Sequence, residues 1–73
     1  MHELDATLRV GKKGIESVAD ELNSQLEDAE FVKVKFLRSS RGGTTTEELA
    51  DEFATQVSAD VARVRGHTAV FER

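Results

Sequence analysis

The side chains best suited to chemistry are two lysines between two glycines, Gly11, Lys12, Lys13 and Gly14, in the stretch TLRVGKKGIESVA. Glycine has no Cβ, so a bulky anion such as a phosphate group can approach the main chain closely. The N–H groups at the start of a helix favour negative charge, and the lysines add two point charges. The spacing therefore predicts a phosphate-binding turn. It is equally typical of a plain tight bend that carries solvated lysines.

Other phosphate-binding patterns are absent from the chain. Neither the P-loop pattern G-x-x-x-x-G-K-[ST] nor the dinucleotide pattern G-x-G-x-x-G occurs. In this role G-x-x-G is the phosphate clamp of KH-type RNA-binding modules, so the turn favours RNA as the ligand.

The residues that catalysis or metal binding would need are also scarce. The chain has no Cys, and two lone histidines, His2 and His67, do not make a metal site. His67 follows a turn glycine, which suits a solvated hairpin residue better than a catalytic one. No Ser/His/Asp order or paired carboxylate pocket is recognisable, and 73 residues leave little room for a deep cleft. We therefore expect no enzymatic activity, no cofactor and no metal.

The charged side chains are sorted by segment. There are 10 Lys and Arg against 14 Asp and Glu, and a net charge of −4 by itself argues against a nucleic-acid partner. Residues 15–30 and 44–58, however, contain acids and no base. The sign of a local surface matters more than that of the total. Besides the turn lysines, the candidate RNA-contacting side chains are Arg9, Lys33, Lys35, Arg38, Arg41, Arg63 and Arg65.

The elements that must position these side chains follow from the hydrophobic pattern. Alternation of apolar and polar residues predicts strands, and apolar residues at intervals of three and four predict helices. Thr45 with Glu48, or Thr44 with Glu47, fits a capping box at the start of a helix. In chain order we expect a strand at 6–10, a helix at 15–26, a strand at 31–38, a loop at 39–43, a second helix, and strands at 60–65 and 67–72 joined at Gly66. The second helix is expected to bury Leu49, Ala50, Phe53, Ala54 and Val57.

This order, β-α-β-α-β-β, predicts an α/β two-layer sandwich with a four-stranded mixed sheet and two helices on one face. The period of two then assigns the strand side chains to faces. The residues expected to face the helices are Ala6, Leu8, Val10, Val32, Val34, Phe36, Ala62 and Val64. The residues expected on the opposite, open face are Arg9, Lys33, Lys35, Arg63 and Arg65. On this face Lys33 and Lys35 either contact RNA or merely solubilise the sheet.

Three stretches in this order, VGKKGI, VKVKFL and VRGHTAVFER, resemble the CRM domain (chloroplast RNA splicing and ribosome maturation), also called the YhbY family, and its archaeal members in particular. The resemblance covers the chain from Ala6 to Arg73. It implies a fold similar to the C-terminal domain of bacterial translation initiation factor three. It also implies RNA binding through Gly11, Lys12, Lys13 and Gly14 and an adjacent basic surface, with a role in ribosome assembly or RNA processing.

Two departures from the family pattern reduce the surface available to RNA. Family members usually carry a basic helix before the first strand, and MHELD is too short and too acidic for one. An aromatic residue usually precedes the final Arg, where this chain has Glu72. Both changes predict an affinity below the family norm.

The remaining expectations concern the chain as a whole. Its length fits one domain, residues 1–73, and we expect a cytoplasmic monomer, since the chain has no long apolar run and no signal-peptide pattern. The acid excess suits adaptation to high salt. The alternative function is a protein-interaction module whose acidic helix faces bind a basic partner such as a ribosomal protein.

Overall fold

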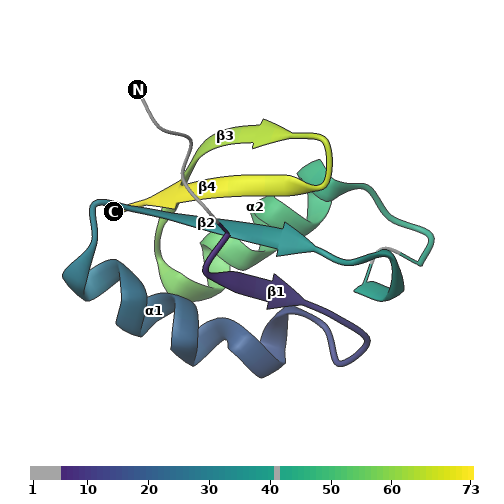
Figure 1. The fold of residues 1–73 in the computed structure, drawn as a ribbon, viewed down its shortest axis with the longest axis horizontal. Coiled ribbons are helices and arrows are strands. Elements are labelled where there is room, and N and C mark those ends of the chain that lie inside the picture. The colour runs from purple at the N-terminus through teal and green to yellow at the C-terminus, as the bar shows by residue number, and fades with distance from the viewer. Residues whose placement is uncertain (1–5, 41) are drawn as a thin grey trace.

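The computed structural model describes residues 6–40 and 42–73 (Figure 1). The expectations for the MHELD segment and for Arg41 therefore lie outside the described residues. In the part of the chain that is described, no helix combines the length and the apolar character needed to cross a bilayer.

The described elements follow the predicted order β-α-β-α-β-β, with two short 3₁₀ helices added. The strands are β1 (Leu8–Val10), β2 (Phe31–Phe36), β3 (Asp60–Arg65) and β4 (Thr68–Glu72). The helices are η1 (Ile15–Val18), α1 (Ala19–Asp28), η2 (Arg38–Ser40) and α2 (Thr46–Val57). Element ends differ from the prediction by a few residues: the strand expected to reach Arg38 ends at Phe36, and Arg38 instead begins η2.

The strands form one mixed sheet in the order β1-β2-β4-β3. β1 and β2 are parallel, whereas β4 is antiparallel to both of its neighbours, β2 and β3. A parallel pair requires a crossover connection, and η1 with α1 supplies it between β1 and β2 (Figure 1). Leu22 of α1 and Phe53 of α2 belong to the same buried cluster as Val34 of β2, so both helices pack on one face of the sheet.

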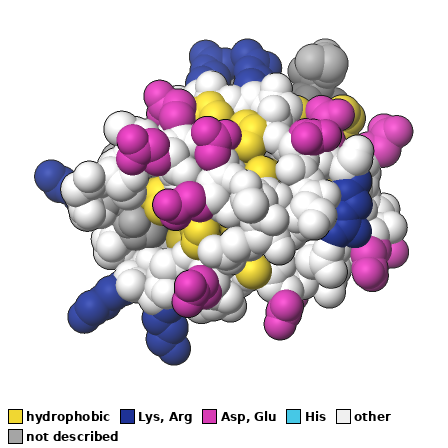
Figure 2. All heavy atoms as spheres, turned by 180° about the vertical axis from the view of Figure 1, so that it is seen from behind, with side chains coloured by type: hydrophobic (Ala, Val, Ile, Leu, Met, Phe, Trp, Pro, Cys, Tyr) yellow, Lys and Arg dark blue, Asp and Glu magenta, His cyan; other side chains and the backbone are white. Residues whose placement is uncertain are grey.

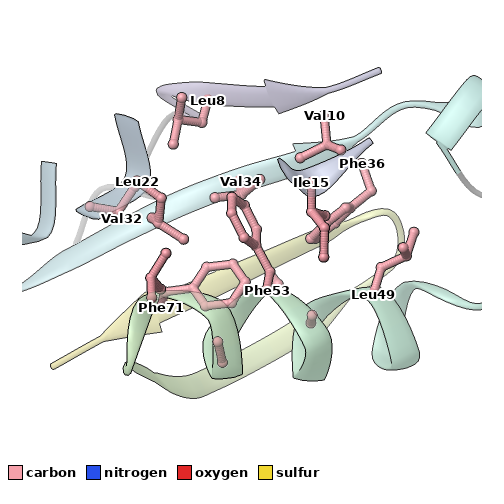
Figure 3. Packing of buried hydrophobic residues seen from close by; sticks show 14 of the residues in the cluster. Leu8, Val10, Ile15, Leu22, Val32, Val34, Phe36, Leu49, Phe53 and Phe71 are labelled. Carbon is pink, nitrogen blue, oxygen red and sulfur yellow. The ribbon is translucent and has the colours of Figure 1, made fainter. Parts of the chain in front are cut away.

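The centre of the core is aromatic. Phe53 of α2 packs edge-on against Phe36 of β2, at 6.3 Å between ring centroids, and against Phe71 of β4, at 5.4 Å (Figure 3). Edge-to-face pairs at this spacing are favourable beyond the area that they bury. These three phenylalanines are fully buried, whereas Phe31 at the start of β2 is 45% exposed. The expectation that at least three of the four are core residues is confirmed.

The prediction that Ala62 faces the helices is wrong. The register of β3 against β4 shifts between Val61, which pairs with Phe71, and Arg63, which pairs with Val70. Ala62 is the extra residue of this β-bulge and is exposed. A bulge inserts one residue without a partner, so the alternation restarts after it. Val61 and Val64 consequently both pack against the core.

The two helices begin differently. The helix predicted over 15–26 starts as the 3₁₀ helix η1 and becomes α-helical at Ala19, with no side chain capping its first turn. α2 has Thr45 as its N-cap, whose side chain accepts the Glu48 N–H at 3.1 Å. The Glu48 carboxylate accepts from the Thr44 hydroxyl at 2.6 Å. Of the two predicted capping boxes, the pair Thr45 and Glu48 therefore marks the start of the helix.

Candidate nucleic-acid interface

The GKKG turn connects β1 directly to η1. The Gly14 N–H donates to the Gly11 carbonyl oxygen at 2.9 Å, which closes a four-residue turn with the lysines at its centre. Lys12 and Lys13 are both exposed. The turn thus presents two ammonium groups to solvent at the end of the first strand.

The two glycines of the turn have different structural reasons to be glycine. Gly14 has φ 82 and ψ −179, a conformation that is open almost only to glycine, so the fold itself requires it. Gly11 has no such requirement. A Cβ at Gly11 would meet Leu37 Cδ1 at 3.7 Å and Ser39 Oγ at 3.9 Å, which are ordinary van der Waals contacts. The bend explains Gly14, whereas Gly11 leaves the main chain bare where the fold would tolerate a Cβ.

Three connecting segments meet at the edge of the sheet where the GKKG turn lies. The parallel strands β1 and β2 end there together, and the Leu37 N–H donates to the Val10 carbonyl oxygen at 2.8 Å. The Phe36 N–H donates to the His67 carbonyl oxygen at 2.7 Å, which brings in the β3–β4 turn. The GKKG turn, the η2 residue Arg38 and the β3–β4 turn are therefore neighbours, although they are distant in sequence.

The strand registers place the basic side chains of the strands on the open face, away from the helices, as predicted. Residues paired across strands point to the same face, because side chains alternate along each strand. One row across the sheet runs Arg9, Lys35, Thr68 and Arg65. The next row runs Lys33, Val70 and Arg63. The predicted side of these five bases is confirmed.

The bulge at Ala62 keeps Arg63 on this face. With Val61 facing the core, an unbroken alternation would turn Ala62 outward and Arg63 inward. The extra residue restores Arg63 to the outside, next to Val70. The sequence pattern correctly predicted that Arg63 lies on the open face. It did so, however, by assigning Ala62 to the helix side, where Val61 lies instead.

The described bases of this region are available to a ligand. They are exposed, except for the half-buried Lys33, and none of their side chains has a hydrogen-bond or ion-pair partner among the described residues. We call this set the basic surface, and it consists of Arg9, Lys12, Lys13, Lys33, Lys35, Arg38, Arg63 and Arg65.

The helix face has the opposite character. Figure 2 shows this face with Asp and Glu side chains spread across it and Lys and Arg side chains at its rim. The acids of α2 include Glu47, Asp51 and Glu52, and all three are exposed. The acids of the helical segments thus lie on the helix face, on the other side of the sheet from the basic residues of the strands.

Sequence reasoning missed the neutral residues and the acids of the open face. Thr68 and Val70 lie between the bases of the two rows, and a third row runs Phe31, Glu72 and Asp60. The alternation within 67–72 carried the signal for these positions, but only the strand pairing shows which bases they accompany. In the described residues, no group of three or more His, Cys, Asp and Glu side chains could hold a metal ion.

Comparisons with known proteins find a family model and a curated relative that match this chain. The CRS1 / YhbY (CRM) domain model matches residues 1–73. A Methanocaldococcus jannaschii protein named "Probable RNA-binding protein MJ0652" is 33% identical over 66 residues, which cover 90% of this chain and 49% of that protein. The chain therefore spans about half the length of this curated relative.

The fold also has a counterpart among solved structures. The solution structure of the hypothetical protein SAV1595 from Staphylococcus aureus, described as "a putative RNA binding protein", superposes with a TM-score of 0.77 at 27% sequence identity. The match covers 99% of this chain and 74% of that chain. It includes the four-stranded mixed sheet and its two helices.

Proposed function

The chain belongs to the CRS1 / YhbY (CRM) domain family, and from this premise we propose that it is a non-enzymatic RNA-binding module. In this proposal the GKKG turn and the basic surface contact the phosphate backbone of a structured RNA. The names of the archaeal relative and the staphylococcal structure, both of which mention RNA binding, support the same ligand class.

The observation that carries the proposal is that Lys and Arg side chains without ion-pair partners come together from separate segments. Lys12 lies in the β1–η1 turn, Lys35 in β2 and Arg65 in β3, and the fold brings all three to one end of the sheet. Unpaired cations on one surface create a local positive potential even when the total charge is negative. Binding to RNA releases the counterions of the neutralised phosphates, so affinity should fall steeply with salt.

The composition of the surface favours contact with the sugar-phosphate backbone of RNA over contact with its nucleobases. Proteins that recognise single strands usually stack bases on aromatic rings. This chain has no Tyr and no Trp, and Phe36, Phe53 and Phe71 are buried. Phe31 lies at the opposite end of β2 from the GKKG turn. Phosphate and shape recognition of a folded RNA is the mode that remains.

The cellular role that we infer is ribosome assembly or another RNA-processing step, carried out by residues 1–73 as one domain and as a monomer. A module without catalytic groups can serve such a role by stabilising an RNA conformation, because a ligand shifts a conformational equilibrium through its differential affinity. Ribosomal RNA is the first candidate, and sequencing the RNA that co-purifies with the tagged protein tests this assignment.

An electrophoretic mobility shift with a labelled stem-loop RNA tests the binding proposal. The double variant Lys12→Ala/Lys13→Ala should weaken binding and lower the slope of log K against log salt by about two units, or about one per lost phosphate contact. Arg73→Gln is the control, because Arg73 lies beside Phe31 and Glu72, at the end of the sheet opposite the GKKG turn. Its guanidinium donates to Asn23 and to the Val57 carbonyl oxygen. Equal losses in the two variants would refute a role for the turn.

A further inference from the structure

The end of the sheet opposite the GKKG turn carries an exposed aromatic ring in a hollow. Phe31 is 45% exposed and is the exposed large hydrophobic residue of the described chain. It lines a hollow of about 420 Å³ between the end of α1, the start of β2 and the end of β4. Phe31 and Phe36 are the two ends of β2, so this hollow lies about 17 Å along the strand from the edge that holds the GKKG turn.

Two carboxylates lie in the same row of the sheet as the ring. Glu72 pairs with Phe31 across β2 and β4, and Asp60 pairs with Glu72 across β4 and β3, so all three share the open face. Neighbouring strands are about 4.8 Å apart, so both carboxylates are within reach of a long side chain that covers Phe31. We define the acidic end as Phe31 and Asp60 together with the acids that line the hollow, Glu27, Asp28, Glu30 and Glu72.

The placement of Glu27 and Asp28 is locally unfavourable. Both lie in the last turn of α1, where no basic residue occurs. The C-terminal end of a helix carries partial negative charge and favours cations, so acids there repel it. Residues that break a local rule without a compensating contact are often retained for function. A bound cation would remove this repulsion.

Within the described chain, one positive charge, that of Arg73, offsets only part of the negative charge of the acidic end. Arg73 lines the hollow, but its guanidinium donates to the Asn23 side chain and to the Val57 carbonyl oxygen. Glu27, Asp28, Glu30 and Glu72 have no hydrogen-bond or ion-pair partner among the described residues. The electrostatic field therefore excludes RNA from this end and attracts positive charge.

We propose that the acidic end binds an arginine-rich segment of a protein partner. An arginine side chain stacks its planar guanidinium on the face of Phe31 and donates to the Glu72 carboxylate beside it. Further arginines of the same segment face Glu27, Asp28 and Glu30. Arginine fits better than lysine, because a guanidinium both stacks on a ring and makes paired hydrogen bonds to a carboxylate. The site is separate from the basic surface, so the partner and RNA bind at the same time.

Fluorescence anisotropy with labelled nona-arginine and nona-lysine peptides, at about 0.1 M salt, tests the proposal. The wild-type chain should bind nona-arginine more tightly than nona-lysine. Phe31→Ser should remove this preference and weaken nona-arginine binding by roughly two- to fivefold, the range of an exposed cation–π contact. Glu72→Gln should weaken it as well. Glu52→Gln on the exposed face of α2, which removes the same charge, should leave it unchanged.

The site of binding is read from amide NMR spectra of the chain with nona-arginine. Shifts should cluster at Phe31, Glu72 and Asp60. No measurable binding, shifts centred on α2, or equal losses in Glu52→Gln and Glu72→Gln would overturn the proposal. Sedimentation of the chain alone at low salt tests whether a second copy of the chain occupies the acidic end instead. A dimer that Phe31→Ser abolishes would likewise overturn the proposal. Phe31→Ser should bind stem-loop RNA as tightly as the wild type, because Phe31 lies outside the basic surface. Loss of RNA binding in this variant would contradict the proposed RNA site.

Discussion

Lys33 of β2 and Arg63 of β3 lie on the same face of the sheet, one on each side of Val70 in β4. The two strands are not neighbours, so the central strand β4 sets the spacing of the two bases, at about 10 Å between their backbones. Val70 adds no charge, which leaves room for one backbone phosphate between the two cations. The β-bulge accommodates Ala62 as an extra residue, so that Arg63 still lies beside Val70 on the open face.

Deletion of Ala62 tests this role of the bulge. Without Ala62, the order Val61, Arg63, Val64 alternates regularly and keeps the observed pairs with Phe71, Val70 and Ala69. We expect the shortened chain to fold and to bind stem-loop RNA within about threefold of wild type, a difference of about 0.65 kcal/mol. Circular dichroism and a mobility shift check this. Deletion of Val70 in β4 is the control and should unfold the chain, because it moves Phe71 out of the core. A folded ΔAla62 chain with Arg63 buried would contradict the register argument.

The two glycines of the GKKG turn should respond differently to alanine. Gly14→Ala should lower the free energy of unfolding by roughly 1–3 kcal/mol, because a Cβ at φ 82 is strained. Gly11→Ala should leave stability within about 0.5 kcal/mol, as its Cβ meets only ordinary contacts. If a phosphate approaches the main chain at this turn, Gly11→Ala should still weaken RNA binding. Urea unfolding and a mobility shift measure the two effects. Undiminished RNA binding by Gly11→Ala would show that no phosphate approaches the main chain closely at this turn.

The acidic helix face should make the fold more stable at high salt. Exposed carboxylates of α1 and α2 repel one another at low ionic strength, and salt screens this repulsion. We expect the melting temperature to rise by about 5 °C or more between 0.1 M and 2 M KCl, equivalent to about 1 kcal/mol in a domain of this size. The triple variant Glu47→Gln/Asp51→Asn/Glu52→Gln should show a smaller rise. Equal melting temperatures at the two salt concentrations would remove the argument for high-salt adaptation.

Much of the fold was predictable because its signals are local. The alternation of Val32, Val34 and Phe36 was enough to place β2 and its buried face. The two possible capping boxes, Thr45 with Glu48 and Thr44 with Glu47, placed the start of α2 to within one residue, and the structure selects Thr45. The 3₁₀ start of the first helix was not predictable, because the spacing of Ile15 and Val18 suits a 3₁₀ turn and an α-helical turn alike.

The parts that could not be predicted depend on contacts between distant segments. A bulge breaks the period of two at a place that the order Val61, Ala62, Arg63 does not reveal. The positive φ of Gly14 separates its role from that of Gly11, although the sequence presents the two glycines as a symmetric pair. The acidic end required the pairing of Phe31 with Glu72, which sequence spacing does not give.

The most direct test of the central claim is an amide NMR titration of the chain with a stem-loop RNA at a stated salt concentration. RNA binding at the basic surface predicts that the largest shift changes occur at the turn residues Gly11 to Gly14, at Arg38, and at Lys33 and Arg63 on either side of Val70. Amides on the exposed faces of α1 and α2 should stay unchanged. Shift changes centred on those helices, or on Phe31 and Glu72, with the GKKG turn unaffected, would contradict the account.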